Sequence, residues 1–473
     1  MIGSPAPTRA PRPRRGTPAV ALLAAAALVG ASFPAPAQQS APIIRDAEIE
    51  QLLRDYTQPL LRAAGLAQQN VQVVIINDRA FNAFVADGRR IFVNAGALME
   101  SATPNQIIGV LAHETGHIAG GHLARLREQL AAASTASILA MLLGVGAMVA
   151  GARSGGSGSG MSQIGAAAIA GPSQAIQNTL FGYMRAQEDQ ADRAAVKFLT
   201  ATGQSAQGMY QTFKRLADQT LYQTPYINPY MQSHPLPSER VAALEGIARA
   251  SPYWDHRDAP ALQARHDLMR AKLYGFIERP GTVARRYPPS DTSLAARYAR
   301  AISAYRFGDP RSAVAQIDSL IQLQPQNPYF YELKGQALLE AGKPGEAISP
   351  LHQAIQHAPN APLIKIMLGQ ALVAANDRAH LDEAITMLQA ALTREPESAE
   401  GYRQLAIAYG LKNDLAHADL ASAQAAFMRG DLKTAREIAM RAKTRFAVGS
   451  PGWVKADDIA SYKPPQTAVF RNR

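Results

Sequence analysis

The chain has 473 residues, a formal net charge of +11 and no cysteine. This length allows two or three domains with sizeable hydrophobic cores, and the lack of thiols excludes disulfides and cysteine-ligated metal sites. No dense stripe of Lys and Arg with interleaved aromatic residues occurs in the sequence, which argues against a nucleic-acid partner.

The first 37 residues read as a secretory signal peptide. Residues 9–15 contain four arginines, residues 19–29 form an apolar stretch, and Ala35-Pro36-Ala37 fits a cleavage site. Removal of this leader takes away four arginines and no acidic residue, so the formal charge falls from +11 to +7. That modest excess is compatible with an anionic membrane surface or acidic partners. We expect export to the periplasm; the alternative is an uncleaved membrane anchor.

The expected mature chain begins with a helix followed by a small sheet. Apolar residues recur at helical spacing between Ile49 and Leu61. Strands are expected over residues 71–76, 80–85 and 89–94, the last two joined by a type I′ turn at Asp87-Gly88. The edge at residues 82–84 is either a place where a peptide substrate adds as an extra strand or a surface that packs against the next helix.

The motif His113-Glu114-Thr115-Gly116-His117 carries the strongest chemical signal. Histidines four residues apart lie one turn apart on one face of a helix, so both imidazoles can reach one metal ion. The glutamate stands beside that ion, where it can accept a proton from an attacking water. Thr103 as N-cap, Pro104 at the first helical position and Gln106 in a capping box predict where this helix begins.

A third histidine, His122, follows His117 by five residues. Five residues turn the side chain about 140° around a helix, away from the metal-binding face. We therefore expect His122 to support the site or the fold rather than to bind the metal.

The next stretch is almost free of charge. Arg153 is the one charged residue between Glu128 and Arg185. Three interpretations of residues 134–182 remain: a hairpin in contact with a membrane, a movable lid over the site, or helices buried in the domain. A lid or a membrane-touching hairpin is favoured over a true membrane span.

A helix over residues 183–202 is expected to complete the metal site. A zinc site with two histidines takes a third protein ligand and leaves one position open, and Glu188 is the best candidate. Asp192, one turn later, could accept a hydrogen bond from the free ring N–H of a ligand histidine. The alternative for this acidic pair is a solvated helix face.

A proline-rich loop contains Ser233-His234-Pro235, and Arg240 follows on the next helix. His234 could hydrogen-bond the oxyanion of the reaction, or it could fill the open metal position and silence the site. Arg240 could stabilise the same oxyanion or pair with a carboxylate.

From about residue 262 the pattern becomes one helix after another. Residues 335–338 (GQAL) recur at 369–372, and residues 346–348 (EAI) recur at 383–385, which places a three-residue insertion at 376–380. A period of about 34 residues predicts tetratricopeptide repeats. We expect four, with degenerate first and last units, which offer a surface for peptides or partner proteins. The alternative is a structural cap on the preceding domain.

Together these motifs resemble the HtpX-like gluzincin peptidases, in which H-E-x-x-H is followed by E-x-x-A-D on a later helix. Residues 113–117 and 188–192 fit that pattern, and so does the Ser-His-Pro loop with an arginine six residues after its histidine. The resemblance implies that His113, His117 and Glu188 bind one zinc ion, that Glu114 is the general base and acid, and that His234 is a regulatory fourth ligand. It also implies a lid near the uncharged stretch.

With the signal peptide and repeats, the resemblance also implies a periplasmic enzyme of outer-membrane quality control. Its substrates would be unfolded or stalled outer-membrane proteins, and its partner would be their assembly machinery, reached through the repeats. Peripheral membrane contact is a further expectation.

The expected architecture is mainly α. A signal peptide covers residues 1–37, an α+β zincin-type metallopeptidase domain covers 38–260, and an α-solenoid of tetratricopeptide repeats covers 261–473. The expected function is that of a zinc-dependent endopeptidase that also has a chaperone role. The alternatives are a repeat-based chaperone or scaffold with a silenced zinc site, and a membrane-anchored stress peptidase.

Overall fold

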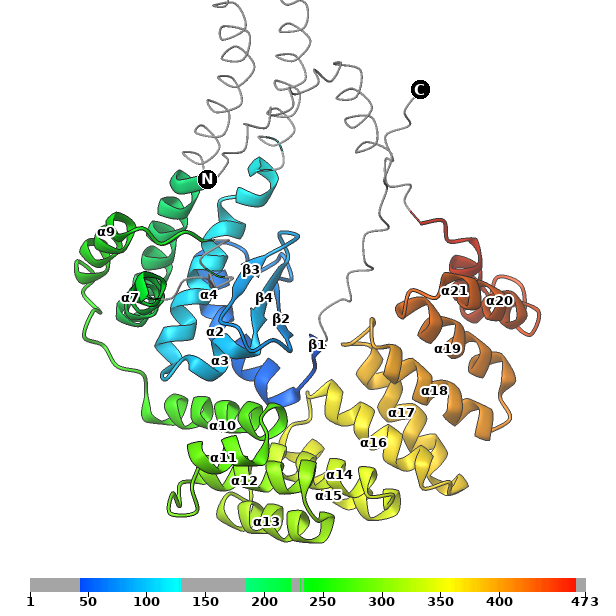
Figure 1. Ribbon diagram of the computed structural model, residues 1–473. Helices are drawn as coiled ribbons and strands as arrows, with labels where there is room; N and C mark the ends of the chain where they lie inside the picture. Colours follow the sequence, from blue (N-terminus) through cyan, green and yellow to red (C-terminus); the bar gives the residue numbers. More distant parts are fainter. Residues whose placement is uncertain (1–42, 127, 129–183, 223–229, 231–233, 465–473) are drawn as a thin grey trace, which may run out of the picture. The chain divides into compact units, whose positions relative to one another are not determined.

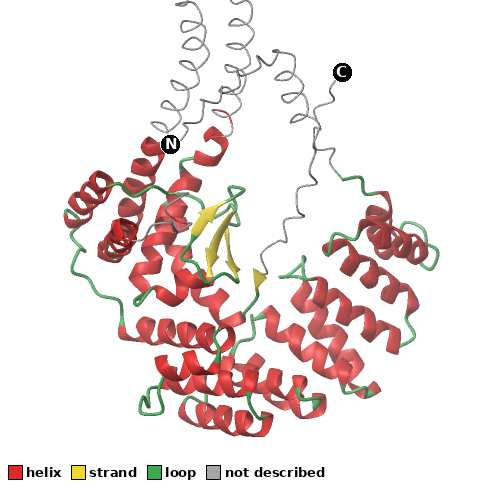
Figure 2. Cartoon of the chain, viewed as in Figure 1, coloured by secondary structure: helices red, strands yellow, loops and turns green. Residues whose placement is uncertain are grey.

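The computed structural model describes residues 43–126, 128, 184–222, 230 and 234–464. The expected signal peptide and the stretch of residues 134–182 lie outside these residues. The chain divides into two units, Met1–Pro42 and Ile43–Arg473, and all that follows concerns the second. Helices dominate its described residues, with one small sheet (Figure 2), as expected. None of the described helices is long and apolar enough to cross a membrane.

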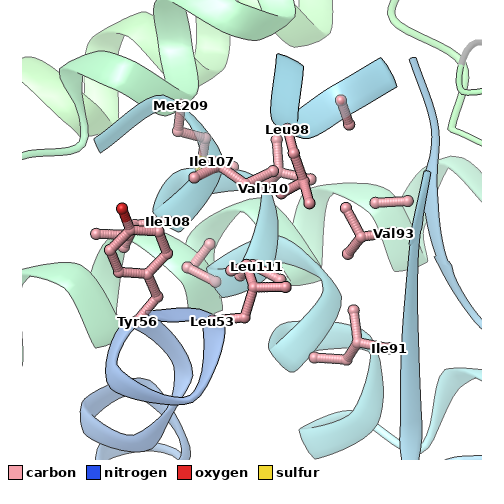
Figure 3. Packing of buried hydrophobic residues seen from close by; sticks show 14 of the residues in the cluster. Leu53, Tyr56, Ile91, Val93, Leu98, Ile107, Ile108, Val110, Leu111 and Met209 are labelled. Carbon is pink, nitrogen blue, oxygen red and sulfur yellow. The ribbon is translucent and has the colours of Figure 1, made fainter. Parts of the chain in front are cut away.

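The first helix, α2 (Ala47–Ala63), buries the apolar face that the sequence predicts. Asp46 caps it, because its side chain accepts a hydrogen bond from the Ile49 N–H at 2.9 Å. Leu53 and Tyr56 of α2 belong to the same hydrophobic core as residues of the sheet and of α4 (Pro104–Ala119) (Figure 3). This core therefore fixes α4 between α2 and the sheet.

The sheet has four strands in the order β1-β2-β4-β3. Their bounds are β1 Ile43–Ile44, β2 Gln72–Ile76, β3 Ala83–Val85 and β4 Arg90–Asn94. β2 pairs with β4 in parallel, from Gln72↔Arg90 to Ile76↔Asn94, while β3 pairs with β4 antiparallel. β3 is thus an edge strand, as expected for residues 82–84, although Ala83 is fully buried and Phe84 stacks on Phe92.

The predicted type I′ turn between β3 and β4 is wrong. A type I′ turn needs a positive φ at both central residues, but here only Gly88, at +76°, has one. Residues 86–89 form a longer loop instead. The Asp87 side chain closes it by accepting hydrogen bonds from the N–H groups of Arg89 and Arg90 at 3.1 and 2.9 Å.

The strand β4 continues into α3 (Ala95–Glu100), and a short turn then leads to α4. α4 begins at Pro104 with Thr103 as its N-cap, as predicted, but the Thr103 side chain makes no capping hydrogen bond. Gln106 does reach back, and its Oε1 accepts from the Ala102 N–H at 2.6 Å. The capping box is therefore formed on one side only.

Two further helices, residues 184–201 and α7 (Gln207–Tyr222), follow beyond the undescribed segment. α9 (Ser238–Arg249) comes after the loop that carries His234. These elements complete the domain in which α4 lies (Figure 1).

The remaining chain is a series of helices. In order they are α10 (Pro260–Ile277), α11 (Pro280–Arg286), α12 (Leu294–Phe307), α13 (Pro310–Leu323), α14 (Pro328–Glu340), α15 (Pro344–His357), α16 (Pro362–Ala374), η1 (Arg378–His380), α17 (Leu381–Leu392), α18 (Ala399–Leu411), α19 (Leu415–Met428), α20 (Leu432–Lys443) and α21 (Pro451–Ser461).

The helices from α12 to α21 form five pairs rather than the four repeats expected, all within residues 294–461, which the structure describes throughout. The first helices of the pairs begin at 294, 328, 362, 399 and 432. The longest spacing contains η1, at the predicted three-residue insertion. The helices of a pair cross closely at Gly335 and Gly369, because a Cβ there would lie 2.5 Å from the Cγ of Leu351 or Leu388.

The helix α10 joins the two regions and begins at Pro260. The domain boundary expected at 260/261 stays a prediction. Met269 and Leu273 belong to the core that contains α4, whereas Leu268 and Ala271 belong to the core of the first repeats. The buried His266 contacts the Tyr56 hydroxyl through Nδ1 at 3.1 Å and the Ser101 carbonyl through Nε2 at 2.8 Å. α10 is therefore a structural part of both regions.

Candidate metal centre

Two histidines of α4 approach each other through their Nε2 atoms. The Nε2 atoms of His113 and His117 are 3.0 Å apart, and the two rings are nearly perpendicular. The His113 side chain is fully buried, and that of His117 is 11% exposed. The four-residue spacing on one helix therefore does what the sequence predicts: it aims two imidazoles at one point.

Glu188, on the helix of residues 184–201, lies against this pair. Its Oε2 is 3.4 Å from Nε2 of His113, and its Oε1 is 3.4 Å from Nε2 of His117. The two helices can approach this closely because residue 116 is glycine: a Cβ there would lie 2.8 Å from the Ala191 carbonyl oxygen. The third candidate ligand is thus held by a direct backbone contact between the two helices.

A fourth group completes the cluster. Nδ1 of the buried His234 lies 3.1 Å from both carboxylate oxygens of Glu188 and 3.4 Å from Nε2 of His113. One ligand atom each from His113, His117, Glu188 and His234 lie within 4.8 Å of one another. His234 therefore stands where a fourth ligand or a group near the open position would be.

The chemistry of these donors fits a divalent cation such as zinc. Nitrogen and carboxylate ligands bind zinc at about 2.0–2.2 Å, so the corners of a tetrahedral site lie about 3.3–3.5 Å apart, close to the separations found here. Burial lowers the pKa of His113, but the nearby Asp192 and Glu188 carboxylates outweigh it and raise this pKa to about 9. The carboxylates around His113 therefore favour a positive charge at this point, and a divalent cation can supply it in place of a proton on His113.

Asp192 contacts Nδ1 of His113, the ring nitrogen on the side away from the cluster. Its Oδ1 lies 2.9 Å from Nδ1 of His113, the distance of a hydrogen bond in which the ring N–H donates to the carboxylate. This assignment places the lone pair of His113 on Nε2, which faces the cluster. The structure therefore brings Asp192 to the position that the sequence predicted for it.

Arg240, from α9, contacts both acidic residues of the site and the loop that carries His234. Its guanidinium forms two hydrogen bonds with Asp192, at 2.7 and 2.8 Å, and lies 2.8 Å from Oε2 of Glu188. It also donates to the Pro235 carbonyl at 2.8 Å, which anchors the loop that carries His234. Of its two predicted roles, the pairing with carboxylates is present; oxyanion stabilisation stays a prediction.

His122 contacts the site from outside. Its Nδ1 is 2.9 Å from Nδ1 of His117, and it is not part of the four-residue cluster. Its backbone carbonyl accepts a hydrogen bond from Gln187 at 3.3 Å. This placement agrees with a supporting role for His122.

Glu114 is fully buried beside the cluster. Its Oε1 lies 3.5 Å from Nε2 of His234, and neither carboxylate oxygen has a hydrogen-bond partner among the described residues. Burial raises the pKa of Glu114, although the nearby histidines lower it in part. A buried carboxylate with raised proton affinity next to a metal site is suited to accept a proton from water.

Aromatic residues that no sequence pattern indicated surround the cluster. The Tyr230 ring centre is 4.7 Å from that of His234, and the Phe213 ring meets His113 edge-on at 5.3 Å. Arg240 lies over the same Phe213 ring at 5.4 Å. Because aromatic residues in helical or loop patterns usually belong to a core, a sequence pattern cannot separate these from others.

Two family models match the chain. Residues 45–248 match peptidase family M48, and residues 298–362 match a tetratricopeptide repeat model. The predicted peptidase domain followed by tetratricopeptide repeats is therefore confirmed.

Curated relatives are about one quarter identical to this chain over the residues that align. A candidate beta-barrel assembly-enhancing protease of Vibrio cholerae is 27% identical over 303 residues, covering 62% of this chain and 59% of that protein. The beta-barrel assembly-enhancing proteases of Yersinia pestis and Escherichia coli K12 are 25% and 24% identical over 309 residues, with the same coverage. The chain thus spans less than two thirds of the length of these relatives.

Proposed function

We propose that this chain, which contains a domain of peptidase family M48 followed by tetratricopeptide repeats, is a zinc-dependent endopeptidase. One observation carries the proposal. Ligand atoms from His113, His117 and Glu188 converge on one point, and the buried carboxylate of Glu114 lies beside them. A purely structural metal site would have no use for such a carboxylate.

The proposed chemistry divides between the ion and the chain. Zinc, when bound by His113, His117 and Glu188, acts as a Lewis acid that makes a nearby water more acidic and polarises a carbonyl. Glu114 takes the proton of the attacking water and then gives it to the leaving amine. Asp192 keeps the lone pair of His113 directed at the cluster, and Arg240 holds Asp192 and Glu188 in place.

The proposed substrates are polypeptides in extended conformation. The edge strand β3 offers a place where such a segment could add to the sheet. The names of the relatives, beta-barrel assembly-enhancing proteases, support outer-membrane proteins as substrates and their assembly machinery as partner. In this proposal the repeats select or deliver these proteins in the periplasm, with peripheral contact to a membrane.

The position of His234 favours a latent enzyme. Its Nδ1 occupies the fourth corner of the cluster, which water needs for hydrolysis. A chain whose site is closed in this way acts as a repeat-based chaperone until His234 moves. The chaperone role is thus the second candidate function, and this contact is the observation that favours it.

Metal content and casein cleavage of the purified full-length protein test the proposal. We expect about one zinc per chain, and cleavage that a chelator abolishes and zinc restores. A protein that carries no zinc after purification and binds none on titration would refute the metallopeptidase proposal. So would cleavage that persists after complete removal of the metal.

Removal of the metal is expected to lower thermal stability. Ligands held at 100 times their dissociation constant stabilise a folded protein by about 2.7 kcal/mol, which corresponds to about 5–10 °C in the Tm of a domain of this size. Differential scanning calorimetry with and without a chelator measures the shift. Re-addition of zinc is the control, and a Tm unchanged by both treatments would contradict the assigned site.

The variant His234→Ala separates the two roles of this histidine. If His234 closes the site, casein cleavage should rise by about tenfold or more, because water then gains the fourth position. If His234 stabilises the oxyanion, cleavage should instead fall by about 10²–10³-fold. We expect the rise, and zinc content measured in parallel shows whether the metal is retained.

A further inference from the structure

Outside the metal centre, a buried cluster of charged residues joins α2 to the repeats. The Nζ atom of Lys272 on α10 is 2.7 Å from Oδ2 of Asp46, 3.2 Å from Oε2 of Glu48 and 3.7 Å from Oε2 of Glu332. The Tyr298 hydroxyl, on α12, donates to Oε2 of Glu48 at 2.9 Å. We call these five residues the Lys272 cluster.

The Lys272 cluster brings together parts of both regions. Asp46 and Glu48 belong to the start of α2, which lies in the core of the peptidase domain. Glu332 belongs to α14, the first helix of the second repeat pair. Lys272 is only 3% exposed, and Glu48 and Glu332 are each 6% exposed. Solvent therefore reaches the cluster mainly at Asp46, whose side chain is 15% exposed.

The charges of the Lys272 cluster do not balance if every carboxyl group is ionised. Three carboxylates then face one ammonium, and buried charge without a counter-ion is costly. Glu332 is the least well paired, because it is farthest from Lys272 and its Oε2 has no hydrogen-bond partner among the described residues. Burial raises the pKa of Glu332 to about 8 and also raises the pKa of Glu48. Burial lowers the pKa of Lys272, but the carboxylates and the nearby Tyr298 outweigh it.

Apolar contact also joins α2 to the repeats, because the buried Ala47 belongs to the same hydrophobic core as Leu338 and Leu351. Three open pockets of about 480, 230 and 580 Å³ lie along α2, each bordered by one of three successive loops that join repeat pairs. These loops cover residues 324–327, 358–361 and 393–398. Arg45, which pairs with Glu395 at 2.7 Å, adds a partly exposed contact, and such contacts contribute little. The Lys272 cluster is therefore the most deeply buried polar connection between α2 and the repeats that the structure describes.

We propose that the Lys272 cluster is a latch that holds the repeats against α2 while one of its three carboxyl groups carries a proton, and that weakens when all three are ionised. Ionised Glu332 on α14 then repels Asp46 and Glu48 on α2, so the repulsion acts directly across the interface. A change in pH could then alter how the repeats pack against the peptidase domain. A partner that supplies or removes charge at this interface could have the same effect.

The sign of the pH effect follows from linkage. Glu332 has a raised pKa when the repeats are docked and an ordinary one, near 4.5, when it is exposed, so the docked state binds more protons between these values. The docking equilibrium should therefore fall by up to tenfold per pH unit from about pH 5 to pH 8 and stay level above. The groups that face Glu332 are Asp46 and Glu48 of α2, Lys272 of α10 and Tyr298 of α12, together with Tyr329 of its own helix.

Amide hydrogen exchange of the full chain tests the latch. Protection of α2 and α14 is measured from pH 5.5 to 9 and corrected for the intrinsic exchange rate, with α20 as an internal reference. We expect the protection of both helices to fall up to tenfold per pH unit towards pH 8 in the wild type, and this dependence to be largely lost in Glu332→Gln. Glu340→Gln, an exposed position on the same helix, is the matched control and should behave as the wild type.

Two results would overturn the proposal. One is protection of α2 and α14 that is independent of pH in the wild type, a measurement that needs no variant. The other is a Glu332→Gln protein, folded by circular dichroism, that keeps the full pH dependence. Glu48→Gln, which also removes one carboxylate, should reduce the dependence, so a second variant remains informative if the first does not fold.

Discussion

The variant Glu114→Gln is expected to lose casein hydrolysis by about 10²–10⁴-fold, while its zinc content stays that of the wild type. The glutamine side chain has nearly the shape of the glutamate but cannot take a proton from water. Glu114 is not one of the four residues whose ligand atoms converge, so the metal should remain bound. Its burial also raises its pKa, which strengthens it as a base.

The loss should appear in kcat rather than in KM, because proton transfer belongs to the chemical step. Metal analysis and a Tm measurement on the same samples separate a lost base from a lost metal or a lost fold. Glu100→Gln is a suitable control, since Glu100 is an exposed residue paired with Arg215. Hydrolysis by Glu114→Gln at the wild-type rate would show that residues 113–117 are not the active centre.

The variant Gly116→Ala is expected to damage the site without removing any ligand. Its new Cβ would lie 2.8 Å from the Ala191 carbonyl oxygen and 3.1 Å from the Ala191 Cα, which are backbone atoms that cannot rotate away. The helix that carries Glu188 must then shift. We expect a loss of about 1–3 kcal/mol in the free energy of unfolding and a fall in zinc affinity of about tenfold or more.

Chemical denaturation and zinc titration measure the two effects. Gly246→Ala is the matched control, because Gly246 also lies within a helix but a Cβ there meets no atom within 4 Å. That change should be neutral or stabilise the protein by up to about 1 kcal/mol, since alanine favours the helix. A Gly116→Ala protein as stable as Gly246→Ala, with unchanged zinc affinity, would contradict the close helix contact.

Local patterns determined much of the fold. The apolar spacing of α2, the start of α4 at Pro104 and the 34-residue period all depend on neighbours along the chain, and the structure confirms them. The type I′ turn and the fourfold repeat count were wrong for different reasons. Asp87 stabilises the loop through side-chain hydrogen bonds that a dipeptide pattern does not reveal. The repeat count depended on short matches such as residues 335–338 with 369–372, which occur only in the second and third pairs.

The sequence by itself determined the donor types of the candidate site. Histidines 113 and 117 share a helix face because of their spacing, and the absence of cysteine left only nitrogen and oxygen ligands. Glu188 and Asp192 could be proposed because they follow at one-turn spacing on a later helix. These inferences need only helix geometry and the chemistry of single residues.

Tertiary structure decided how distant groups meet. Three contacts depend on how helices pack: the approach of Glu188 to α4 over Gly116, the contact of His234 with Glu188, and the pairing of Arg240 with both acids. They join residues up to 75 positions apart in the chain. The Lys272 cluster is similar: its carboxyl groups lie 46 to 332 residues into the chain, and each alone reads as a solvated surface acid. Burial and charge balance arise only when the elements pack against one another, so no local sequence pattern can predict them.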